Sequence, residues 1–465
     1  MSQVAKNTKL LLTAFVVQKL LSLLYLPFVA RSLGVEKSGR YFLVLSFVTL
    51  FSVLIDMGLA NVIAKEVAKS RERAEEFIAN IFGAKAILAL LTFGIIVISA
   101  KLIGYSVEMQ GLIVLASLIV ILEAVHGTLY GALRGLENMR YESLGIIGGQ
   151  LITVIIGIIA ILGTGSLQLL ILALVAGGVF NVFWSIRSLH IHGIKIRLRF
   201  SSPALRGLFY LALPFAASAI FARVYGYLDT VLLSKLSSAT EVGLYTAVYK
   251  LVFVFQFIPI ALTSSAYPAM SRAFVENREQ LNKIFATSIR ILWIVALPVT
   301  LVLAGMSGAV TQFVYSTKFL AAKDIMTILA LSLPLAFIYW PLGSMLNATD
   351  HQKTNAKIMG LTMLVNAGLN LVLIASAVLV LFSTIKPALL GLIKDILKAT
   401  LVAVALAIPL HFLAGRVSVI LLATLSGLVY LALLYGLKII TSDEVNVVLN
   451  LLKRKSVEIP ASPNQ

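Results

Sequence analysis

Several cationic residues stand inside long apolar stretches of this sequence, namely Lys19, Lys85, Arg223 and Lys250. An ionisable side chain deep in an apolar layer costs at least about 2.5 kcal/mol, so it should face a cavity or a partner. Lys19 and Arg223 are the two deepest. Because Arg can grip a phosphate bidentately and Lys acts as a point charge, the two are candidate ligands of an anionic group. The alternative is a structural ion pair with Glu123 or Asp229.

Lys85 and Arg290 lie nearer the ends of their apolar segments. They could line the same cavity, as could Asp229. The interpretation we prefer for the two cations is that their long stems let the charged ends reach the membrane interface.

Glu123 and His126 are three residues apart, so a helix places them on one face. A carboxylate beside a group that titrates near neutral pH could bind a proton or a cation, which suggests ion coupling. The alternative, which we prefer, is a hydrogen-bonded pair between helices. Asp56, in the run IDMGL, could bind an ion or cap a helix end, and the structural role is the preferred one.

Motifs of enzymatic chemistry are missing from the sequence. The chain has no cysteine and no GxxxxGK[ST] loop, and no acidic pair or Ser-His-Asp set converges in one exterior loop. We therefore expect no catalytic residue, no metal, no cofactor and no enzymatic activity.

The elements that must position these residues are membrane helices. The 465 residues are 60% hydrophobic and 12% charged, with a mean hydropathy of +0.99, which exceeds what a soluble domain can carry. A span takes about 20 apolar residues, so the length allows on the order of a dozen. This composition excludes a soluble enzyme, a nucleic-acid factor, a disordered tail and a single-anchor receptor.

The apolar runs predict an all-α polytopic membrane protein with about 13 hydrophobic segments, hence about 12–14 spans. The segments lie near 8–30, 41–62, 79–101, 112–133, 142–162, 167–189, 207–234, 243–270, 284–305, 325–347, 355–383, 399–414 and 417–438. The predicted organisation is an N-terminal lobe (1–189), a basic connector (190–206), a C-terminal lobe (207–383), additional helices (384–440) and a polar tail (441–465). The segment 355–383 is too long for one span and too short for two, so a short or re-entrant helix is possible there.

The charge balance sets an orientation. Lys and Arg number 38 against 20 Asp and Glu, a net charge of +18, and most of these cations lie in alternate loops. Because basic loops stay in the cytoplasm, we expect a cytoplasmic N-terminus in the cytoplasmic (plasma) membrane. The surplus therefore indicates orientation and not a nucleic-acid partner.

The two halves repeat. Gly39-Arg40-Tyr41 matches Gly243-Leu244-Tyr245 at an offset of 204 residues (243 − 39), and Lys19 and Arg223 each precede their glycine by 20 residues (39 − 19 and 243 − 223). Two similar halves around a central cavity are typical of secondary transporters. The sequence thus predicts two pseudo-symmetric six-helix lobes, each with a cation midway along its first helix.

The run ARSLGVEKSGRYFLVLSFVTLFSVLIDMGL resembles the opening of the polysaccharide-biosynthesis (Wzx-type) flippases of the multidrug/oligosaccharidyl-lipid/polysaccharide exporter superfamily. The second half supports this with LALPFAASAIFARVYGYLDTVLLSKLSSATEVGLYTAVYKL and TSSAYPAMSRAF. The resemblance covers roughly residues 8–374, and after Ile374 the sequence departs from the family pattern. It implies a V-shaped central cavity with cationic residues, which Lys19 and Arg223 match, and alternating-access movement of a lipid-linked oligosaccharide.

We therefore expect a monomeric flippase for a polyprenyl-phosphate-linked oligosaccharide. Its partners would be membrane lipids and possible glycosyltransferases or a polymerase of the same pathway. The alternatives are a cation- or proton-coupled multidrug exporter of the same superfamily and a lipid-linked peptidoglycan-precursor flippase. A membrane-embedded glycosyltransferase or polymerase is a weaker alternative, since it needs acidic or metal-binding exterior loops.

Overall fold

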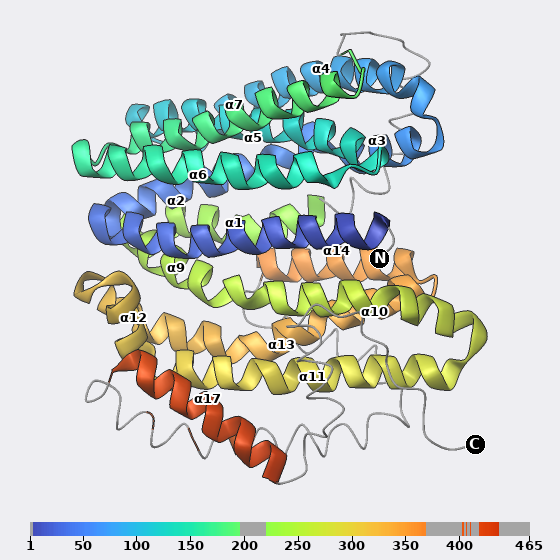
Figure 1. The fold of residues 1–465 in the computed structure, drawn as a ribbon. Coiled ribbons are helices and arrows are strands. Elements are labelled where there is room, and N and C mark those ends of the chain that lie inside the picture. The colour runs from blue at the N-terminus through green and yellow to red at the C-terminus, as the bar shows by residue number, and fades with distance from the viewer. Residues whose placement is uncertain are drawn as a thin grey trace. The chain divides into compact units, whose positions relative to one another are not determined.

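The computed structural model describes residues 3–195, 220–368 and 418–436, with residues 402, 403, 406 and 410 between them. All regular structure in these ranges is helical, and no strand occurs in them (Figure 1). Within the described residues, 9 helices are long and apolar enough to cross a membrane. The prediction of an all-α, multi-pass membrane protein is confirmed.

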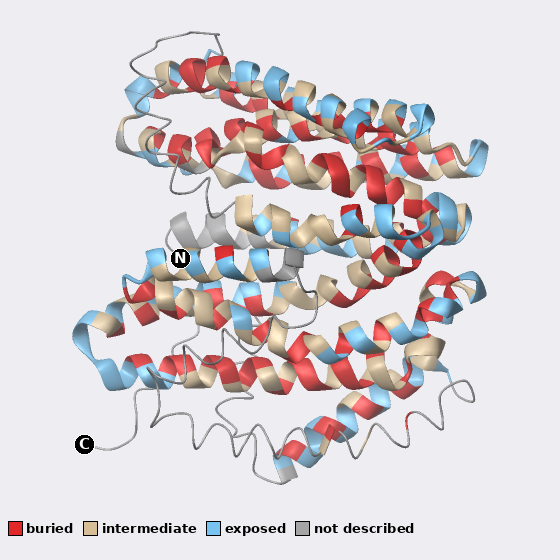
Figure 2. Cartoon of the chain, turned by 180° about the vertical axis from the view of Figure 1, so that it is seen from behind, coloured by how far each residue is buried: buried red, intermediate tan, exposed pale blue. Residues whose placement is uncertain are grey.

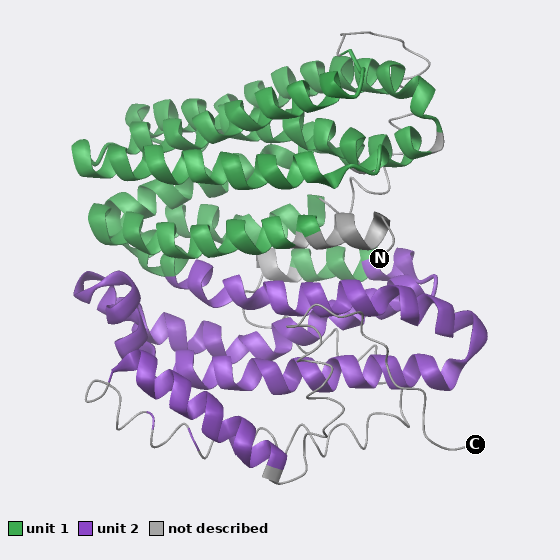
Figure 3. Ribbon diagram, in the orientation of Figure 1, with its two compact units in different colours: residues 1–247, 356–373 green, residues 248–355, 374–465 purple. Residues whose placement is uncertain are grey.

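The chain divides into two compact units (Figure 3). Unit 1 comprises residues 1–247 and 356–373, and unit 2 comprises residues 248–355 and 374–465. Unit 1 contains α1 (Gln3–Leu33), α2 (Val35–Asp56), α3 (Leu59–Lys69), α4 (Ala74–Leu102), α5 (Val107–Gly135), α6 (Met139–Gly163), α7 (Leu167–Ile191), a helix over 220–236, the start of α9 (Ala239–Phe253) and most of α14 (Gln352–Gly368). Unit 2 contains α10 (Phe257–Glu276), α11 (Arg278–Gly305), α12 (Ser307–Tyr315), α13 (Lys323–Ala348) and α17 (Val419–Gly436).

Unit 1 is organised around α5, which packs against α2, α3, α4 and α7. A cluster of buried apolar side chains from α3, α4 and α5 fills the space between them, with Val67, Ile78 and Leu129 fully buried. In unit 2, α11 has the same role between α10 and α13, and it also contacts α17. These two central helices fix the positions of the polar side chains described below.

Large apolar side chains also lie on the outside of the helices. Figure 2 marks the exposed residues along the helices in pale blue. Leu24, Leu90 and Leu162 are each about three-quarters exposed (74%, 74% and 75%). In water such a surface would drive aggregation. Facing lipid, it is the expected outer face of a membrane helix.

The second predicted helix differs from the structure in where it stops. The pattern predicts one helix over 41–62, but α2 ends at Asp56 and α3 begins at Leu59. Met57 and Gly58 have φ angles of 43° and 77°, and Met57 closes α2 by donating its N–H to the Val53 carbonyl. Left-handed residues end a helix. The break places the Asp56 carboxylate at a helix end, which apolar periodicity does not reveal.

The internal repeat extends to the helix boundaries. α2 begins at Val35 and α9 at Ala239, and α4 begins at Ala74 and α11 at Arg278. Both pairs are 204 residues apart (239 − 35 and 278 − 74), the offset found in the sequence. The repeat is therefore a repeat of helices and not only of a short motif.

Part of the predicted organisation falls outside the described residues. This holds for the connector beyond residue 195, for residues 369–383 of the ambiguous segment 355–383, for most of the 399–414 helix and for the 441–465 tail. The last predicted segment, 417–438, is confirmed as α17. The two-lobe boundary at 190–206 stays a prediction.

Candidate functional site

An ion pair joins α4 to the end of α2. The Lys85 ammonium donates hydrogen bonds to Asp56 Oδ1 at 2.8 Å and to the Ala124 carbonyl of α5 at 2.9 Å. The side chain of Lys85 is 3% exposed and that of Asp56 is 42% exposed. The preference for Lys85 reaching the interface is therefore wrong. The α2 break brings the Asp56 carboxylate within hydrogen-bonding distance of Lys85. Because the ammonium is paired there, the Lys85 side chain need not extend to the membrane interface.

Lys85 also borders a cavity of about 130 Å³, with Phe82, Ala86 and Ala89 of α4 and with apolar residues of α2 and α5. Neither Lys19 nor Arg223 lines this cavity, so the role of Lys85 in a cavity shared with them stays a prediction. Because the ammonium itself is committed to Asp56 and Ala124, the cavity wall is almost wholly apolar.

Glu123 lies next to this pair, midway along α5. Its side chain is exposed. Arg223, on the helix over 220–236, and Asp56 are both within electrostatic range of its carboxylate. In the described part of the chain, no direct ion pair joins Glu123 to Arg223. Among these four charged groups, the described contacts contain one direct ion pair, that of Lys85 and Asp56.

Of the two acids predicted as possible partners of Arg223, Asp229 has another contact. It accepts a hydrogen bond of 2.8 Å from the Tyr245 hydroxyl. The Arg223 guanidinium instead lies over the ring of Tyr227, at 6.0 Å from its centroid. In the described residues, the Arg223 guanidinium therefore makes no hydrogen bond to Asp229.

His126 follows Glu123 by one turn of α5, as predicted. Its ring packs against the Tyr130 ring, with the two ring centroids 5.4 Å apart. Its Nδ1 is buried and has no hydrogen-bond partner among the described residues. Lys85 is within electrostatic range of this ring. The preferred interpretation, a hydrogen-bonded pair between helices, stays a prediction, and His126 Nδ1 has no partner for it in the described part of the chain.

Lys19 and Arg290 do not belong to this group of charged residues. Lys19 is exposed, and Arg290 lies in unit 2. Lys19 lies midway along α1 on an exposed strip with Phe15, Val16 and Leu20. Arg290 is half-buried on α11 of unit 2. The roles of both residues remain predictions.

Two further sets of contacts were not anticipated from the sequence. The Tyr105 hydroxyl is 2.9 Å from Ser234 Oγ, and the Lys235 ammonium lies 4.6 Å from the Tyr105 ring centroid. Burial raises the pKa of Tyr105, so its hydroxyl stays neutral. Tyr105 follows α4 and the other two residues end the helix over 220–236, so a loop of the first half contacts the second half. Aromatic and hydroxyl residues at helix ends are too common for this contact to be predicted.

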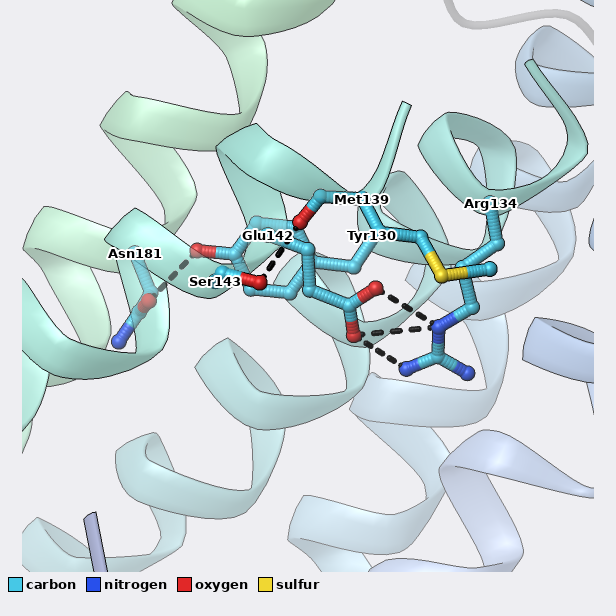
Figure 4. Close-up of polar contacts among 6 residues, drawn as sticks. All are labelled: Tyr130, Arg134, Met139, Glu142, Ser143 and Asn181. Atoms are coloured by element: carbon cyan, nitrogen blue, oxygen red, sulfur yellow. Dashed lines mark hydrogen bonds and ion pairs between the residues drawn. The ribbon is translucent and has the colours of Figure 1, made fainter. Parts of the chain in front are cut away.

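The second set is a buried ion pair between α5 and α6 (Figure 4). Arg134 Nε donates to Glu142 Oε2 at 2.8 Å, and Glu142 is 1% exposed. Nearby, the Tyr130 hydroxyl donates to Asn181 of α7 at 2.6 Å. These contacts join α5, α6 and α7, and they hold the helix on which Glu123 lies. The described residues contain no group of three or more His, Asp or Glu that could hold a metal ion.

A family model described as polysaccharide biosynthesis protein matches residues 4–274, more than half of the chain. The chain belongs to this family. A second model, MatE, matches residues 214–372. A Shigella flexneri protein described as a candidate O-antigen transporter is 24% identical over 337 residues, which cover 68% of this chain and 78% of that protein.

Solved structures share the fold of this family member at low identity. The lipid II flippase MurJ in an inward closed conformation has a TM-score of 0.72 and 16% identity, covering 93% of this chain and 100% of its own. An outward-facing multidrug-resistance MATE transporter has a TM-score of 0.56 and 17% identity, covering 90% and 96%. A transporter of the same superfamily from Pyrococcus furiosus, whose binding pocket is described as having reverse polarity, has a TM-score of 0.53 and 17% identity, covering 94% and 96%. The two-lobe transporter fold of these proteins agrees with the predicted fold class.

Proposed function

We propose that this protein flips a polyprenyl-phosphate-linked oligosaccharide across the cytoplasmic membrane by alternating access. Membership of the polysaccharide biosynthesis protein family and the similarity to a candidate O-antigen transporter support this function. The observation that carries it is Arg223, a half-buried cation within a helix of a membrane protein, with no direct carboxylate contact in the described residues.

The charges of the site favour an anion. Lys85 and Asp56 neutralise each other at 2.8 Å. Among the described contacts, Arg223 makes no hydrogen bond to Asp229, which accepts one from Tyr245, and Lys19 holds the matching position in the first half of the repeat. A diphosphate headgroup is the kind of anion that these two cations could bind, Arg223 bidentately and Lys19 as a point charge.

The same balance argues against the main alternative, a cation- or proton-coupled multidrug exporter. The site of an exporter of cationic drugs should carry a surplus of carboxylates, because a buried charge needs an opposite charge. Here the first helix of each half offers a cation instead, Lys19 in one and Arg223 in the other, at matching positions of the repeat. A drug-efflux assay in a sensitive host separates the two functions, and efflux without lipid flipping would favour the exporter.

A peptidoglycan-precursor flippase is the second candidate, and the TM-score of 0.72 to the lipid II flippase MurJ favours it. Both substrates carry a diphosphate between a polyprenyl tail and a sugar, so Lys19 and Arg223 would serve either one. Vesicles loaded in parallel with lipid II and with a polyprenyl-linked oligosaccharide distinguish them by their rates.

The loop charges support an orientation with the N-terminus in the cytoplasm. In that orientation the substrate enters from the cytoplasmic side, where glycosyltransferases assemble it, and leaves outside, where a polymerase would use it. These enzymes are the partner classes we propose, and we propose a monomer as the working unit.

The test is flipping of a fluorescent polyprenyl-diphosphate oligosaccharide in reconstituted vesicles. We expect the double variant Lys19→Ala, Arg223→Ala to lose at least about tenfold in rate, the equivalent of one charge-assisted contact. Lys101→Ala, an exposed cation at the end of α4, is the matched control and should keep the wild-type rate. Wild-type flipping by the double variant would refute the headgroup assignment.

A further inference from the structure

The loop between α4 and α5 fixes the backbone of Tyr105. Gly104 has a φ of 76°, and the N–H groups of Gly104 and Tyr105 donate to the carbonyls of Lys101 and Ala100. These bonds are the pattern of a helix that is closed by a left-handed glycine. The Ser106 side chain then caps the start of α5. Tyr105 therefore lies between two helix caps, and its backbone has little freedom to move.

Two further contacts hold Tyr105 to the first half of the repeat. Its ring packs edge-on against the ring of Phe47 on α2, with centroids 5.6 Å apart and an interplanar angle of 90°. Phe47 is fully buried, so it cannot swing aside. The Gln110 side chain of α5 donates to the Tyr105 carbonyl at 2.7 Å. The first half of the chain thus sets where the Tyr105 side chain points.

The same side chain makes two contacts with the second half. The Ser234 hydroxyl already donates to the Val231 carbonyl at 2.7 Å, so at 2.9 Å the Tyr105 hydroxyl is the donor to Ser234 Oγ. The Lys235 ammonium lies 4.6 Å from the Tyr105 ring centroid, within the range of a cation–π contact. Adjacent residues of the helix over 220–236 therefore bind the hydroxyl and the ring of one tyrosine.

These contacts lie on one side of the membrane. α2 runs towards α3 and α4 runs back, so the end of α4 is on the same side as the start of α2. The helix over 220–236 ends just before α9 begins, and Gly39 of α2 closely approaches Gly243 of α9 there. We call this contact of the two halves the outer seam, after its side in the proposed orientation. All of it belongs to unit 1.

We propose that Tyr105 is the latch of the outer seam. The seam opens only after the Tyr105 hydroxyl leaves Ser234 and the ring leaves Lys235, and these two contacts set the fraction of time for which it is open. The inference rests on the proposed function, because alternating access requires that this side opens to release the substrate. The glycine contact allows the two helices to close, and Tyr105 supplies the polar attraction that keeps them closed.

The chemistry of the latch suits a contact that opens in every cycle. Lys235 is exposed, so water can hydrate its ammonium once the ring has left it. Ser234 keeps its hydrogen bond to Val231. Opening therefore leaves no buried unpaired group. Losing a hydrogen bond between neutral groups shifts an equilibrium by about two- to tenfold, and losing an exposed cation–π contact shifts it by about two- to fivefold. Contacts of this strength favour closure and still permit opening.

The experiment uses a cysteine reporter in the full chain, whose sequence contains no cysteine. Thr246 on α9 is 3% exposed and follows Gly243 by about one turn, so it lies towards the side of α9 that faces α2. In Thr246→Cys, a membrane-impermeant thiol reagent added at the outer face reacts only while the seam is open. The labelling rate is therefore proportional to the open fraction, however small that fraction is.

We expect Tyr105→Phe, which keeps the ring, to raise the labelling rate of the reporter about fivefold, and Lys235→Met to raise it about threefold. Two matched controls should leave it unchanged. Tyr130→Phe loses a tyrosine hydrogen bond of 2.6 Å, but this bond goes to Asn181 within the first half. Lys101→Met removes an exposed cation at the end of α4.

Cross-linking tests the same contact by holding it closed. In the variant Tyr105→Cys, Ser234→Cys, a cleavable bifunctional thiol reagent as long as the tyrosine side chain should join the two positions, because the native side chains meet at 2.9 Å. The joined protein should lose flipping, and cleavage of the reagent should restore it. The control is Arg71→Cys, Glu137→Cys, a pair 3.5 Å apart within the first half on the opposite side of the membrane, where joining should leave flipping unchanged.

The outcomes separate the latch from the proposed function. If Tyr105→Phe and Lys235→Met label at the rate of the reporter alone, or if the joined protein flips normally, the latch is wrong. A reporter that reacts in no background would show that the seam does not open on this side, which also overturns it. Labelling needs no substrate. If these variants raise the labelling rate and no lipid-linked oligosaccharide is flipped, the proposed function is wrong and the latch stands.

Discussion

Gly39 of α2 and Gly243 of α9 lie backbone against backbone. A Cβ on Gly39 would clash with the Ala239 carbonyl oxygen and come within 2.8 Å of the Gly243 amide nitrogen. A Cβ on Gly243 would clash with the Val35 carbonyl oxygen and come within 3.1 Å of the Gly39 nitrogen. Each glycine faces the residue that lies four positions before the other, so the contact has two-fold pseudo-symmetry.

This contact joins the two sequence repeats at the start of their second helices. With the N-terminus in the cytoplasm, as proposed, both helices begin at the outer side of the membrane. Tyr105, Ser234 and Lys235 lie at helix ends on that same side. A flippase working by alternating access must separate such contacts to release its substrate outward.

The first prediction is that Gly39→Val abolishes flipping without preventing insertion. The added side chain has no room at the carbonyl of Ala239, so the two helices cannot close. We expect at least a tenfold loss of flipping rate, measured with the fluorescent lipid in vesicles, and the same for Gly243→Val. Gly94→Val on α4 is the control, because nothing lies within 4 Å of its Cβ position. Normal flipping in both glycine variants would show that the contact need not form.

The second prediction concerns the buried pair of Arg134 and Glu142. Glu142→Ala leaves the Arg134 charge without its partner, and breaking a buried pair costs about 3–5 kcal/mol. Since Arg134 is one-third exposed (33%), we expect the lower end of that range. Thermal unfolding in detergent measures the loss.

The control for this experiment is an exposed pair on the same face of the membrane. Glu137 Oε2 lies 3.5 Å from the guanidinium nitrogen Nη2 of Arg71, and both side chains are 60% exposed. Glu137→Ala should cost under about 1 kcal/mol, as surface pairs do. Equal losses in Glu142→Ala and Glu137→Ala would mean that the Glu142 pair does not stabilise unit 1.

The third prediction concerns the ion pair of Lys85 and Asp56 at the α2 break. Asp56→Asn removes the carboxylate from the Lys85 ammonium, which is 3% exposed, and should lower stability by about 1–3 kcal/mol. Lys85→Met should cost less, because Asp56 is 42% exposed and can be hydrated. The double variant should recover part of the Asp56→Asn loss, and strict additivity of the two would argue against direct coupling.

Much of the fold follows from the sequence, because long apolar runs have few alternatives to membrane helices. For instance, α6 (Met139–Gly163) and α7 (Leu167–Ile191) correspond to the predicted segments near 142–162 and 167–189. The repeat offset of 204 residues also holds for helix starts. Hydropathy and spacing carry this information directly.

The failures have a physical cause in common. The end of α2 depends on left-handed backbone at Met57 and Gly58, which an apolar pattern does not encode. The pairing of Lys85 depends on that break, because the break places Asp56 Oδ1 at 2.8 Å from the Lys85 ammonium nitrogen. The direct contact of Gly39 and Gly243 needs two helices far apart in the chain to meet. Sequence periodicity gives the face of a helix but not the neighbour of that face.

The fourth prediction tests whether Arg223 acts through geometry as well as charge. Arg223→Lys keeps the positive charge, but it loses the planar fork that grips a diphosphate and stacks on Tyr227, whose ring centroid is 6.0 Å away. We expect Arg223→Lys to flip about tenfold more slowly than the wild type at limiting lipid, and Arg223→Gln to lose substantially more. Lys19→Arg should be tolerated, because a point charge at that position is replaced by another cation. The measurement is the flipping rate against lipid concentration in vesicles. A wild-type curve for Arg223→Lys would mean that charge alone suffices there, and equal losses for Arg223→Lys and Arg223→Gln would mean that the fork, not the charge, holds the headgroup.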